Sequence, residues 1–236
     1  MPCRSDDDQH KMLLTFERKK IKNYLLKRIL AKAVCSLSHS NARQNGPKAI
    51  FAHDTIGSNI NAFGWYEPNS LDAVEKFIQY NFPAVKAGVV LDIGANIGNH
   101  SIYFSRSFDK VIAFEPHPVT YQILKINTLD HENISTLNIA LSDSIGDQQL
   151  YYNNANMGAA RLSKHGNDFP RHVKTSVTTL DSLSLDSNRV TMIKIDAEGH
   201  ESRIILGGEE LIKKAKPIIL LEVHARAVSY THLTLP

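Results

Sequence analysis

From Val89 to His224 the sequence alternates short apolar runs with segments of helical periodicity, and this alternation restricts the fold more than any other feature. The strand-length runs are residues 89–95, 110–116, 134–143, 190–199 and 216–224. Helical patterns lie between them at residues 99–108, 119–131 and 200–215, the last interrupted at Gly207 and Gly208. Strands that alternate with helices predict a parallel sheet with helices on both faces. We therefore expect an α/β fold, with an added hairpin formed by residues 147–154 and 174–183.

The size of the chain is that of one α/β domain with extensions. Its 236 residues divide into an N-terminal basic extension with a linker (1–48), the domain (49–224) and a short tail (225–236). Cys3 and Cys35 fit neither a metal site nor a disulfide framework, so we expect a reducing, cytoplasmic location. No apolar run approaches the roughly 20 residues of a membrane span. A net charge of +3 is too small to indicate a nucleic-acid partner.

Residues 11–37 have the pattern of a basic helix. Ile21, Leu25, Ile29 and Ala33 recur at four-residue steps, and Leu26, Leu30 and Val34 widen this stripe. Lys19, Lys22 and Lys32 interrupt it. Such a helix either packs on the domain with solvated lysines, or contacts a membrane surface or an acidic partner. We expect residues 1–10 to be disordered and residues 38–48 to form the linker, because Ser, Asn, Gly and Pro are frequent there.

The predicted strands carry acidic residues at their carboxyl ends. These are Asp92, Glu115, Asp143, Asp196, Glu198 and Glu222, with His224 beside the last. In parallel sheets ligands bind beyond this edge. Phosphate groups bind N–H donors and positive charge, so an edge this acidic suits a cation better than a dinucleotide.

The turn after the first strand supports the same interpretation. Gly94 and Gly98 are separated by Ala95, Asn96 and Ile97, which differs from the G-x-G-x-x-G of dinucleotide-binding turns. Glu115 follows Asp92 by 23 residues, where an acid binds the hydroxyls of an adenosine ribose. The edge therefore fits adenosine attached to a positive group, as in S-adenosylmethionine, and disfavours a nicotinamide oxidoreductase. The alternative is a tight strand–helix turn without a ligand.

The motifs occur in a familiar order. "LDIGANIGNHS", "VIAFEPHP", "NIALSD", "VTTLDSL", "IKIDAEGHE" and "ILLEVH" together resemble the successive motifs of the FkbM-type methyltransferases. The resemblance covers roughly residues 65–224. It implies a Rossmann-like class I methyltransferase fold that uses S-adenosylmethionine. It also implies methylation of a hydroxyl oxygen on a small molecule, often a sugar or a secondary metabolite.

The resemblance also assigns roles to residues. The residues implied at the methionine end of the cofactor are Asp92, Gly94, Asn96 and Gly98. Glu115 would hold the ribose, and Pro116 would shape the loop beside it. Near the adenine it implies Ala140, Leu141 and Ser142, and near the transferred methyl group Asp196, Glu198, His200 and Glu201. Glu67, in the segment "GWYEP", would also approach the cofactor.

The chemistry requires a group that accepts the proton of the hydroxyl. Asp196 and His200 are the candidate bases, with Glu198 beside them. The alternative is a divalent metal held by Asp196, Glu198 and Glu222, which the D-x-E spacing does not decide. We expect acceptor recognition in residues 144–175, in the N-terminal extension and in the C-terminal segment that we expect to be missing.

Two other functions stay open. A nucleic-acid methyltransferase is disfavoured because the fourth motif is "KIDAEGHE" and not the Asn-Pro-Pro-aromatic type. The second is a truncated, non-catalytic module that binds S-adenosylmethionine. Class I folds add two strands after the fifth, whereas twelve residues follow His224, and "SYTHLTLP" resembles translated adapter sequence. We therefore expect the C-terminal strands to be missing and the edge of the fifth strand to be exposed.

Overall fold

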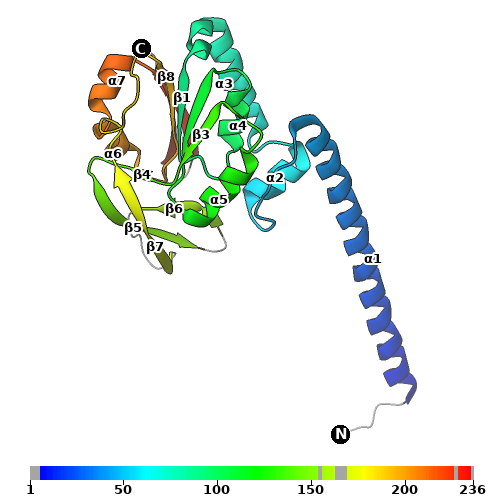
Figure 1. The fold of residues 1–236 in the computed structure, drawn as a ribbon. Coiled ribbons are helices and arrows are strands. Elements are labelled where there is room, and N and C mark those ends of the chain that lie inside the picture. The colour runs from blue at the N-terminus through cyan, green and yellow to red at the C-terminus, as the bar shows by residue number, and fades with distance from the viewer. Residues whose placement is uncertain (1–5, 154–155, 163–168, 226–227, 235–236) are drawn as a thin grey trace.

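The main sheet has the predicted parallel core. The computed structural model describes the backbone of residues 6–153, 156–162, 169–225 and 228–234, and the side chains of 22–153, 157–162 and 169–222. The strand order is β10-β9-β8-β1-β2-β3 (Figure 1). The strands are β1 (Val89–Ile93), β2 (Lys110–Phe114), β3 (Ile134–Leu137), β8 (Val190–Ile195), β9 (Ile218–Ala225) and β10 (Val228–Thr234). All neighbours are parallel except β9 and β10.

Helices cover both faces of this sheet, as predicted. On one face lie α3 (Pro68–Asn81) and α4 (Asn99–Ser105), and α5 (Pro118–Asn127) follows β2 on that side (Figure 1). On the other lie α6 (Glu201–Leu206) and α7 (Glu209–Ala215), which separate at the predicted glycine pair. Alternate strand residues face opposite ways. Val90 and Met192 join Phe104 in one core, and Leu91, Ile193 and Ile195 join Ile204 and Leu211 in the other.

A second, smaller sheet lies beyond the carboxyl ends of the main strands. Its order is β4-β7-β5-β6, formed by β4 (Ala140–Leu141), β5 (Gly146–Asn153), β6 (Asn156–Arg161) and β7 (Arg171–Thr178). The antiparallel pairing of β5 with β7 confirms the added hairpin. The single strand predicted at 134–143 is wrong, because β3 joins the main sheet whereas β4 pairs with β7. Residues 163–168 of the segment expected to recognise the acceptor lie outside the described residues.

The tail forms a strand that the sequence did not predict. β10 pairs antiparallel with β9 from Val228 opposite Ala225 to Thr234 opposite Ile219. The expectation of an exposed edge on the fifth strand is therefore wrong, because β10 covers the edge of β9, whereas the expected absence of the two C-terminal strands stays a prediction. The "VSYTHLT" of this strand is rich in β-branched and aromatic residues, which favour strands. Residues 226–227 and 235–236, and the side chain of His224, lie outside the described residues.

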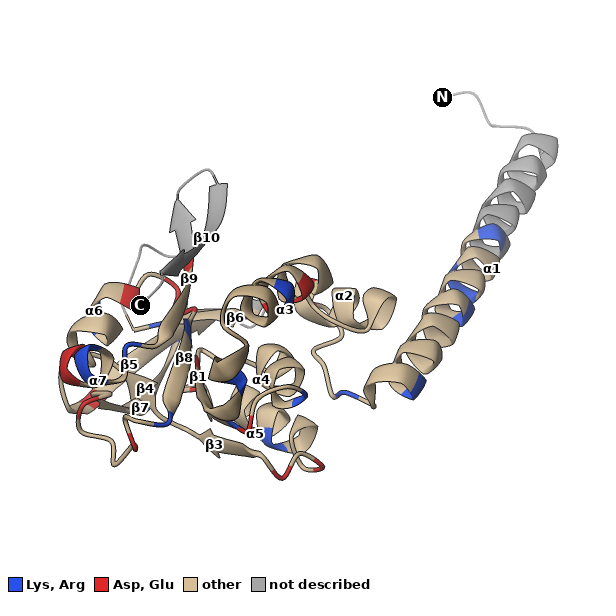
Figure 2. Ribbon diagram, turned by 90° about the horizontal axis from the view of Figure 1, so that it is seen from above, with Lys and Arg blue, Asp and Glu red and all other residues tan. Residues whose placement is uncertain are grey.

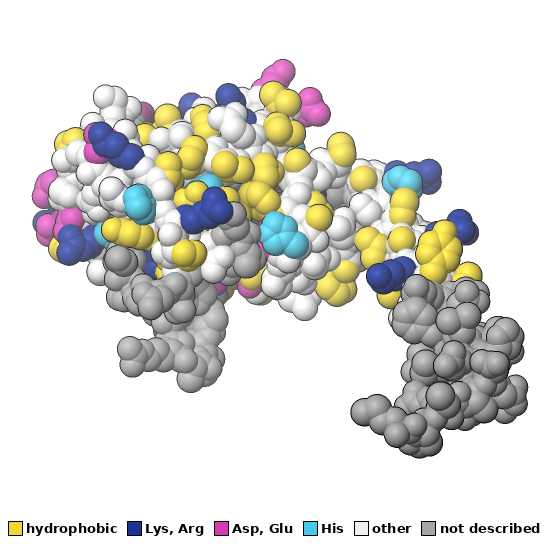
Figure 3. Space-filling view, turned by 90° about the horizontal axis from the view of Figure 1, so that it is seen from below, with side chains coloured by type: hydrophobic (Ala, Val, Ile, Leu, Met, Phe, Trp, Pro, Cys, Tyr) yellow, Lys and Arg dark blue, Asp and Glu magenta, His cyan; other side chains and the backbone are white. Residues whose placement is uncertain are grey.

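The N-terminal helix is longer than predicted and stands away from the sheet. It is α1 (Asp6–Asn45), so residues 6–10 and 38–45 are helical, and the linker expected at 38–48 is largely wrong. Residues 1–5 lie outside the described part. The side chains of residues 22–37 are exposed (Figures 1 and 3), and Val34 and Leu37 line a hollow together with Ser58, Asn61 and Ala62. Only the end of α1 meets α2 (Thr55–Phe63), where Asn41 Nδ2 donates to the carbonyl oxygen of Asn61 at 2.7 Å.

Between α1 and the sheet, α2, α3 and a short 3₁₀ helix at Pro83–Ala87 occupy a region where the sequence predicted no element. Figure 2 shows α1 leading away from this region, with Lys and Arg along its coloured part. None of the helices in the described part of the chain combines the length and the apolar character needed to cross a bilayer.

Candidate functional site

The turn after β1 packs between the ends of the neighbouring strands β2 and β8. The backbone N–H groups of Gly94 and Ala95 both donate to the carbonyl oxygen of Phe114, at 3.0 and 2.9 Å. Gly94 has φ +75°, and a Cβ there would lie 1.8 Å from the carbonyl oxygen of Asp196. Only glycine fits this contact. The turn therefore brings the ends of β1, β2 and β8 together at one place.

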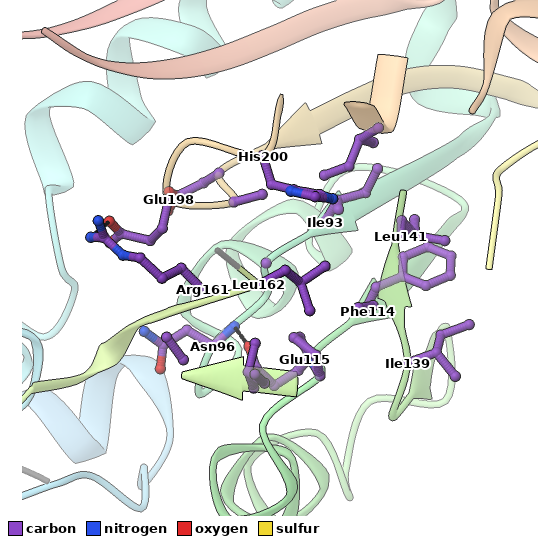
Figure 4. A pocket seen from close by; sticks show the side chains of 18 of the residues that line it. Ile93, Asn96, Phe114, Glu115, Ile139, Leu141, Arg161, Leu162, Glu198 and His200 are labelled. Carbon is purple, nitrogen blue, oxygen red and sulfur yellow. Dashed lines mark hydrogen bonds and ion pairs between the residues drawn. The ribbon is translucent and has the colours of Figure 1, made fainter. Parts of the chain in front are cut away.

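A pocket of about 620 Å³ opens beside this turn (Figure 4). The apolar side chains in its wall include Ile93, Phe114, Ile139, Leu141 and Ile204. The polar and charged ones are Asn96, Glu115, Arg161, Asp196, Glu198 and His200. An apolar wall beside several acids suits a ring attached to hydroxyl and cationic groups.

Glu115 is held at the floor of the pocket by two backbone amides. Its Oε2 accepts from the N–H of Asn96 at 2.9 Å and its Oε1 from the N–H of His117 at 2.8 Å. The side chain is buried, and burial raises the pKa of its carboxyl group from the usual 4.5 to about 7. A carboxylate oxygen can accept more than one hydrogen bond. Glu115 is therefore fixed in orientation and retains acceptor capacity for a ligand in the pocket that it lines.

Asp92 lies beneath the turn and does not line the pocket. It is fully buried, accepts from the hydroxyl of Ser101 at 2.6 Å and forms an ion pair with Lys194 at 3.2 Å. Lys194 also donates to the carbonyl oxygen of Gly94 at 3.0 Å. Burial alone would lower the pKa of Lys194, but the carboxylates of Asp92 and Asp196 raise it above its usual value. Asp92 therefore holds a buried ammonium group that supports the turn.

A second hollow lies on the α3 and α4 face of the sheet. The polar residues of its wall are Glu67, Ser70, His100, Lys194 and Glu222. The carboxyl groups of Asp196 and Glu222 are hydrogen-bonded to each other. Burial and the charge of Asp196 raise the pKa of Glu222 to about 7. Because Asp196 lines the pocket and Glu222 lines the hollow, this carboxyl pair connects the two spaces.

The turn after β8 carries Asp196 and Glu198 in different directions. Asp196 lies 3.6 Å from the ammonium of Lys194, whereas Glu198 forms an ion pair with Arg161 of β6 at 3.2 Å. Figure 4 shows Glu198 and Arg161 meeting at one side of the pocket. The metal set of Asp196, Glu198 and Glu222 is therefore not assembled. No group of three or more His, Cys, Asp or Glu side chains in the described residues is arranged to hold a metal ion.

His200 faces the pocket from the start of α6. Its Nε2 lies 2.8 Å from the hydroxyl oxygen of Ser142, and burial lowers the pKa of its imidazole. Glu201 accepts from the backbone N–H groups of Ala197 and Gly199, at 3.1 and 3.0 Å, and so stabilises the turn.

The remaining predicted site residues divide between the pocket and its surroundings. Pro116 and Ala140 line the pocket with Gly94 and Asn96. Gly98 stands at the start of α4 with φ +93°, where a Cβ would lie 2.8 Å from Leu124 Cδ1. Asp143 does not join the acidic edge, because it forms an ion pair with Arg203 at 3.2 Å.

The family is shown by comparison with known proteins. The family model described as "Methyltransferase FkbM domain" matches residues 92–234. The chain belongs to the FkbM methyltransferase family. The resemblance of its motifs to this family is thereby confirmed, and so is the methyltransferase class that they predict.

Two curated relatives have sequences similar to this FkbM domain. One is the hexuronic acid methyltransferase AglP of Haloferax volcanii, 28% identical over 139 residues, which are 58% of this chain and 56% of the relative. The other is the methyltransferase sdnD of Sordaria araneosa, 40% identical over 68 residues, which are 27% of this chain and 26% of the relative. The chain thus matches about half of one relative and a quarter of the other.

Among solved structures, a methyltransferase FkbM from Methylobacillus flagellatus is similar, with a TM-score of 0.43 and 18% identity. The similarity covers 58% of this chain and 33% of the other.

The FkbM domain contains site residues that the sequence did not single out. Met157, Arg161 and Leu162 reach the pocket from β6 and the residue after it, in the excursion that sequence patterns mark only as an added hairpin. Asn99 clamps the "GWYEP" segment to α4, since its side chain accepts from the N–H of Tyr66 at 2.9 Å and donates to the Tyr66 carbonyl oxygen at 3.0 Å. A polar residue in the first turn of a helix after a glycine-rich turn is the signal that could have identified it.

Proposed function

We propose that this chain transfers the methyl group of S-adenosylmethionine to a hydroxyl oxygen of a saccharide or another small metabolite. The observation that carries the proposal is the position of Asp196. It lines the pocket beside Glu115 and is hydrogen-bonded to Glu222 in the second hollow. A cofactor bound at Glu115 and an acceptor bound at the Arg161 side of the same pocket would meet at this carboxylate.

The pocket residues fit the cofactor. Glu115 offers acceptor oxygens to ribose hydroxyls, and the apolar wall of Ile139 and Leu141 suits an adenine ring. The carboxylates near Gly94 suit a sulfonium and an ammonium group, because opposite charges attract strongly where water is scarce. The same acids would repel the diphosphate of a dinucleotide.

Methyl transfer needs alignment, exclusion of water and a proton acceptor. When bound, S-adenosylmethionine supplies a methyl group on a positively charged sulfur, and its C–S bond breaks as the new C–O bond forms. The carboxylate of Asp196 takes the hydroxyl proton, and Glu222 shares the charge of the pair through their hydrogen bond. Lys194, fixed by Asp92, holds Asp196 in place through an ion pair.

His200 is the second candidate base. Burial lowers the pKa of its imidazole, so the ring is neutral near pH 7 and can accept a proton. Its Nε2 is hydrogen-bonded to Ser142, however, whereas Asp196 connects the two spaces. Asp196 is therefore the preferred base.

Two facts support a saccharide acceptor. The relative AglP acts on a hexuronic acid, as its name states. Arg161 also lines the pocket from β6, and a guanidinium group suits a carboxylate-bearing sugar. We propose hexuronic acids as the first acceptors to test.

The test compares Asp196→Asn with Asp143→Asn. Each variant is incubated with S-adenosylmethionine and glycans that contain hexuronic acid, neutral glycans or nucleic acid, and S-adenosylhomocysteine is measured. Because Asn keeps the shape but takes no proton, Asp196→Asn should bind the cofactor normally but transfer the methyl group about 10²–10⁴-fold more slowly.

The matched control Asp143→Asn removes an exposed carboxylate and should transfer at the normal rate. Faster transfer to nucleic acid than to any glycan would replace the proposal with a nucleic-acid methyltransferase. Cofactor binding without transfer to any acceptor would indicate a binding module.

A further inference from the structure

One face of α1 exposes a continuous apolar stripe. We define the apolar stripe as Leu25, Leu26, Ile29, Leu30, Val34 and Leu37. Each of these side chains leaves between 49% and 64% of its surface exposed. With 3.6 residues per turn, they fall within about half of the helix circumference. Exposed apolar residues scattered singly are ordinary, whereas a contiguous row of them marks a contact surface.

The rest of the helix surface in the same segment carries basic side chains beside the exposed ring of Tyr24. Lys27, Arg28 and Lys32 lie there, and all three side chains are exposed. From Arg18 to His53 the chain contains nine Lys and Arg residues and no Asp or Glu. In Figure 2 the described part of α1 accordingly carries blue segments and no red ones. A surface that meets α1 should therefore be both apolar and negatively charged.

Among the residues of α1 whose side chains the structure describes, those near its C-terminal end hold it to the domain. The indole N–H of Trp65 donates to Asn45 Oδ1 at 3.1 Å, and Lys48 Nζ lies 4.0 Å from the centre of the Trp65 ring. Lys48 also donates to the carbonyl oxygen of Gly64 at 3.2 Å. These contacts fix the base of the helix, which leads away from the sheet (Figure 1), and Val34 and Leu37 of the apolar stripe border a hollow beside α2.

We propose that the apolar stripe docks α1 on an anionic lipid surface. A helix with leucines on one face and lysines and arginines on the other lies in the interface of a bilayer, where lipid tails cover the leucines and phosphate groups attract the cations. The long basic side chains reach the headgroup level from the sides of the helix. The helix lies along the surface because Lys27, Arg28 and Lys32 would be costly in the hydrocarbon.

Two other partners fit the same surface less well. A second copy of α1 would cover the leucines but would bring two basic helices together with no acid between Arg18 and His53 to offset them. A nucleic acid would pair with the basic residues but would leave the six apolar side chains in water. An anionic bilayer would cover the apolar stripe and also attract the basic side chains.

The experiment measures binding of the full chain to vesicles by co-sedimentation. Vesicles of phosphatidylcholine alone are compared with vesicles that also contain phosphatidylserine, at low and high salt. We expect binding to the anionic vesicles that weakens as salt rises. The readout does not depend on methyl transfer, so it is independent of the function proposed above.

Two triple variants test the two faces of the helix. Leu26→Gln, Ile29→Gln and Leu30→Gln together keep helix propensity but remove half of the apolar stripe, and binding should fall by at least about a hundredfold. Lys27→Gln, Arg28→Gln and Lys32→Gln together should weaken binding to anionic vesicles by about tenfold to a hundredfold. The matched control is Ala31→Gln with Cys35→Gln, which adds polar groups outside the apolar stripe and should bind as the wild type does.

Three results would overturn the proposal. The first is no binding to either kind of vesicle. The second is equal binding by the Leu26, Ile29 and Leu30 variant and its control. The third is a dimer in light scattering that this variant dissociates while vesicle binding is unchanged, because the stripe would then be an interface between copies. Circular dichroism of each variant verifies that α1 is still helical.

Discussion

Replacing Gly94 with alanine tests the idea that the turn after β1 is built around a close approach of two backbones. A Cβ at this position would lie 1.8 Å from the carbonyl oxygen of Asp196, whereas ordinary contacts of this kind are 3.4–4 Å. Gly199 provides a matched control in the same region, since its φ is +92° and a Cβ there would meet nothing within 4 Å. Both substitutions carry the cost of a left-handed backbone, and only Gly94→Ala adds a clash.

The expected losses of stability follow from the cost of the left-handed backbone and from the clash of the added Cβ. The left-handed conformation costs alanine about 1–2 kcal/mol, and the loss of glycine's freedom in the unfolded chain returns about 0.4–1 kcal/mol. Gly199→Ala should therefore destabilise the protein by about 1 kcal/mol. Gly94→Ala must also move the end of β8, which adds about 1–3 kcal/mol of overpacking and strains the bond from the N–H of Asp196 to the Ile93 carbonyl oxygen. We expect a loss of about 2–4 kcal/mol in total.

Urea unfolding followed by circular dichroism measures the difference, and calorimetry measures cofactor affinity. Gly94→Ala should lower the unfolding midpoint strongly and abolish binding of S-adenosylmethionine, because Asp196 and Lys194 shift with the turn. Gly199→Ala should do neither. Two variants of equal stability and equal affinity would show that the turn relaxes freely and that the reasoning from the contact is wrong.

Three further predictions concern Glu115 and Arg161 of the pocket. Glu115→Gln should weaken binding of S-adenosylmethionine by about tenfold to a hundredfold in calorimetry, because a hydrogen bond to a charged acceptor contributes about 1.5–3 kcal/mol. An unchanged dissociation constant would exclude Glu115 as the ribose ligand. The pKa of Glu115 is raised from 4.5 to about 7 by burial, so the native state binds more protons than the unfolded chain between these values. The stabilisation that comes from this raised pKa is fully present below pH 4.5 and is lost as pH rises through 7. The unfolding free energy of the wild type should therefore fall by about 2–3 kcal/mol over this window, and Glu115→Gln should remove this fall. Parallel pH profiles of the two proteins would contradict the assignment of the raised pKa to Glu115. Arg161→Gln should raise the KM for an acidic saccharide more than for a neutral one, with the exposed Arg203→Gln as the control, and equal changes for both acceptors would remove Arg161 from acceptor recognition.

Much of the fold was predictable because it depends on the periodicity of apolar residues and on the order of strands and helices along the chain. The parallel strands β1, β2, β8 and β9 are apolar runs buried by helices on both sides, and such runs are visible in sequence. The elements that were missed lack this signal. β6 is a short edge strand of the smaller sheet, with the sequence "NMGAAR". α1 was recognised, but its ends were not, because residues 38–45 are polar and carry no period.

The candidate site was predictable where residues follow a strand directly and unpredictable where a side chain crosses between elements. The pocket wall contains Glu115, Asn96 and Asp196 as expected from their places at strand ends. Asp92 has the same kind of place, yet it points away from the pocket toward Ser101 and Lys194. A position at the end of a strand predicts that the residue lies at this edge of the sheet, but it does not predict to which face of the sheet the side chain points. That direction depends on which partners are buried on each face. Arg161 comes from the excursion, and nothing in its local sequence indicates that it reaches Glu198.

The alternation of the strands explains why Asp196 and Glu198 separate although their spacing would place them together. In β8, Met192 and Lys194 face α3 and α4, and continuing this alternation by one step directs Asp196 to the same side, where Lys194 and Glu222 lie. The strand ends at Ile195, however, and Glu198 has φ +52°, so the chain has already turned when it reaches this residue. Glu198 therefore faces β6 and forms its ion pair with Arg161. The D-x-E pattern thus yields two carboxylates with different partners. The first is joined to Glu222 and is the one available for proton transfer, and the second connects the turn after β8 to the smaller sheet across the pocket.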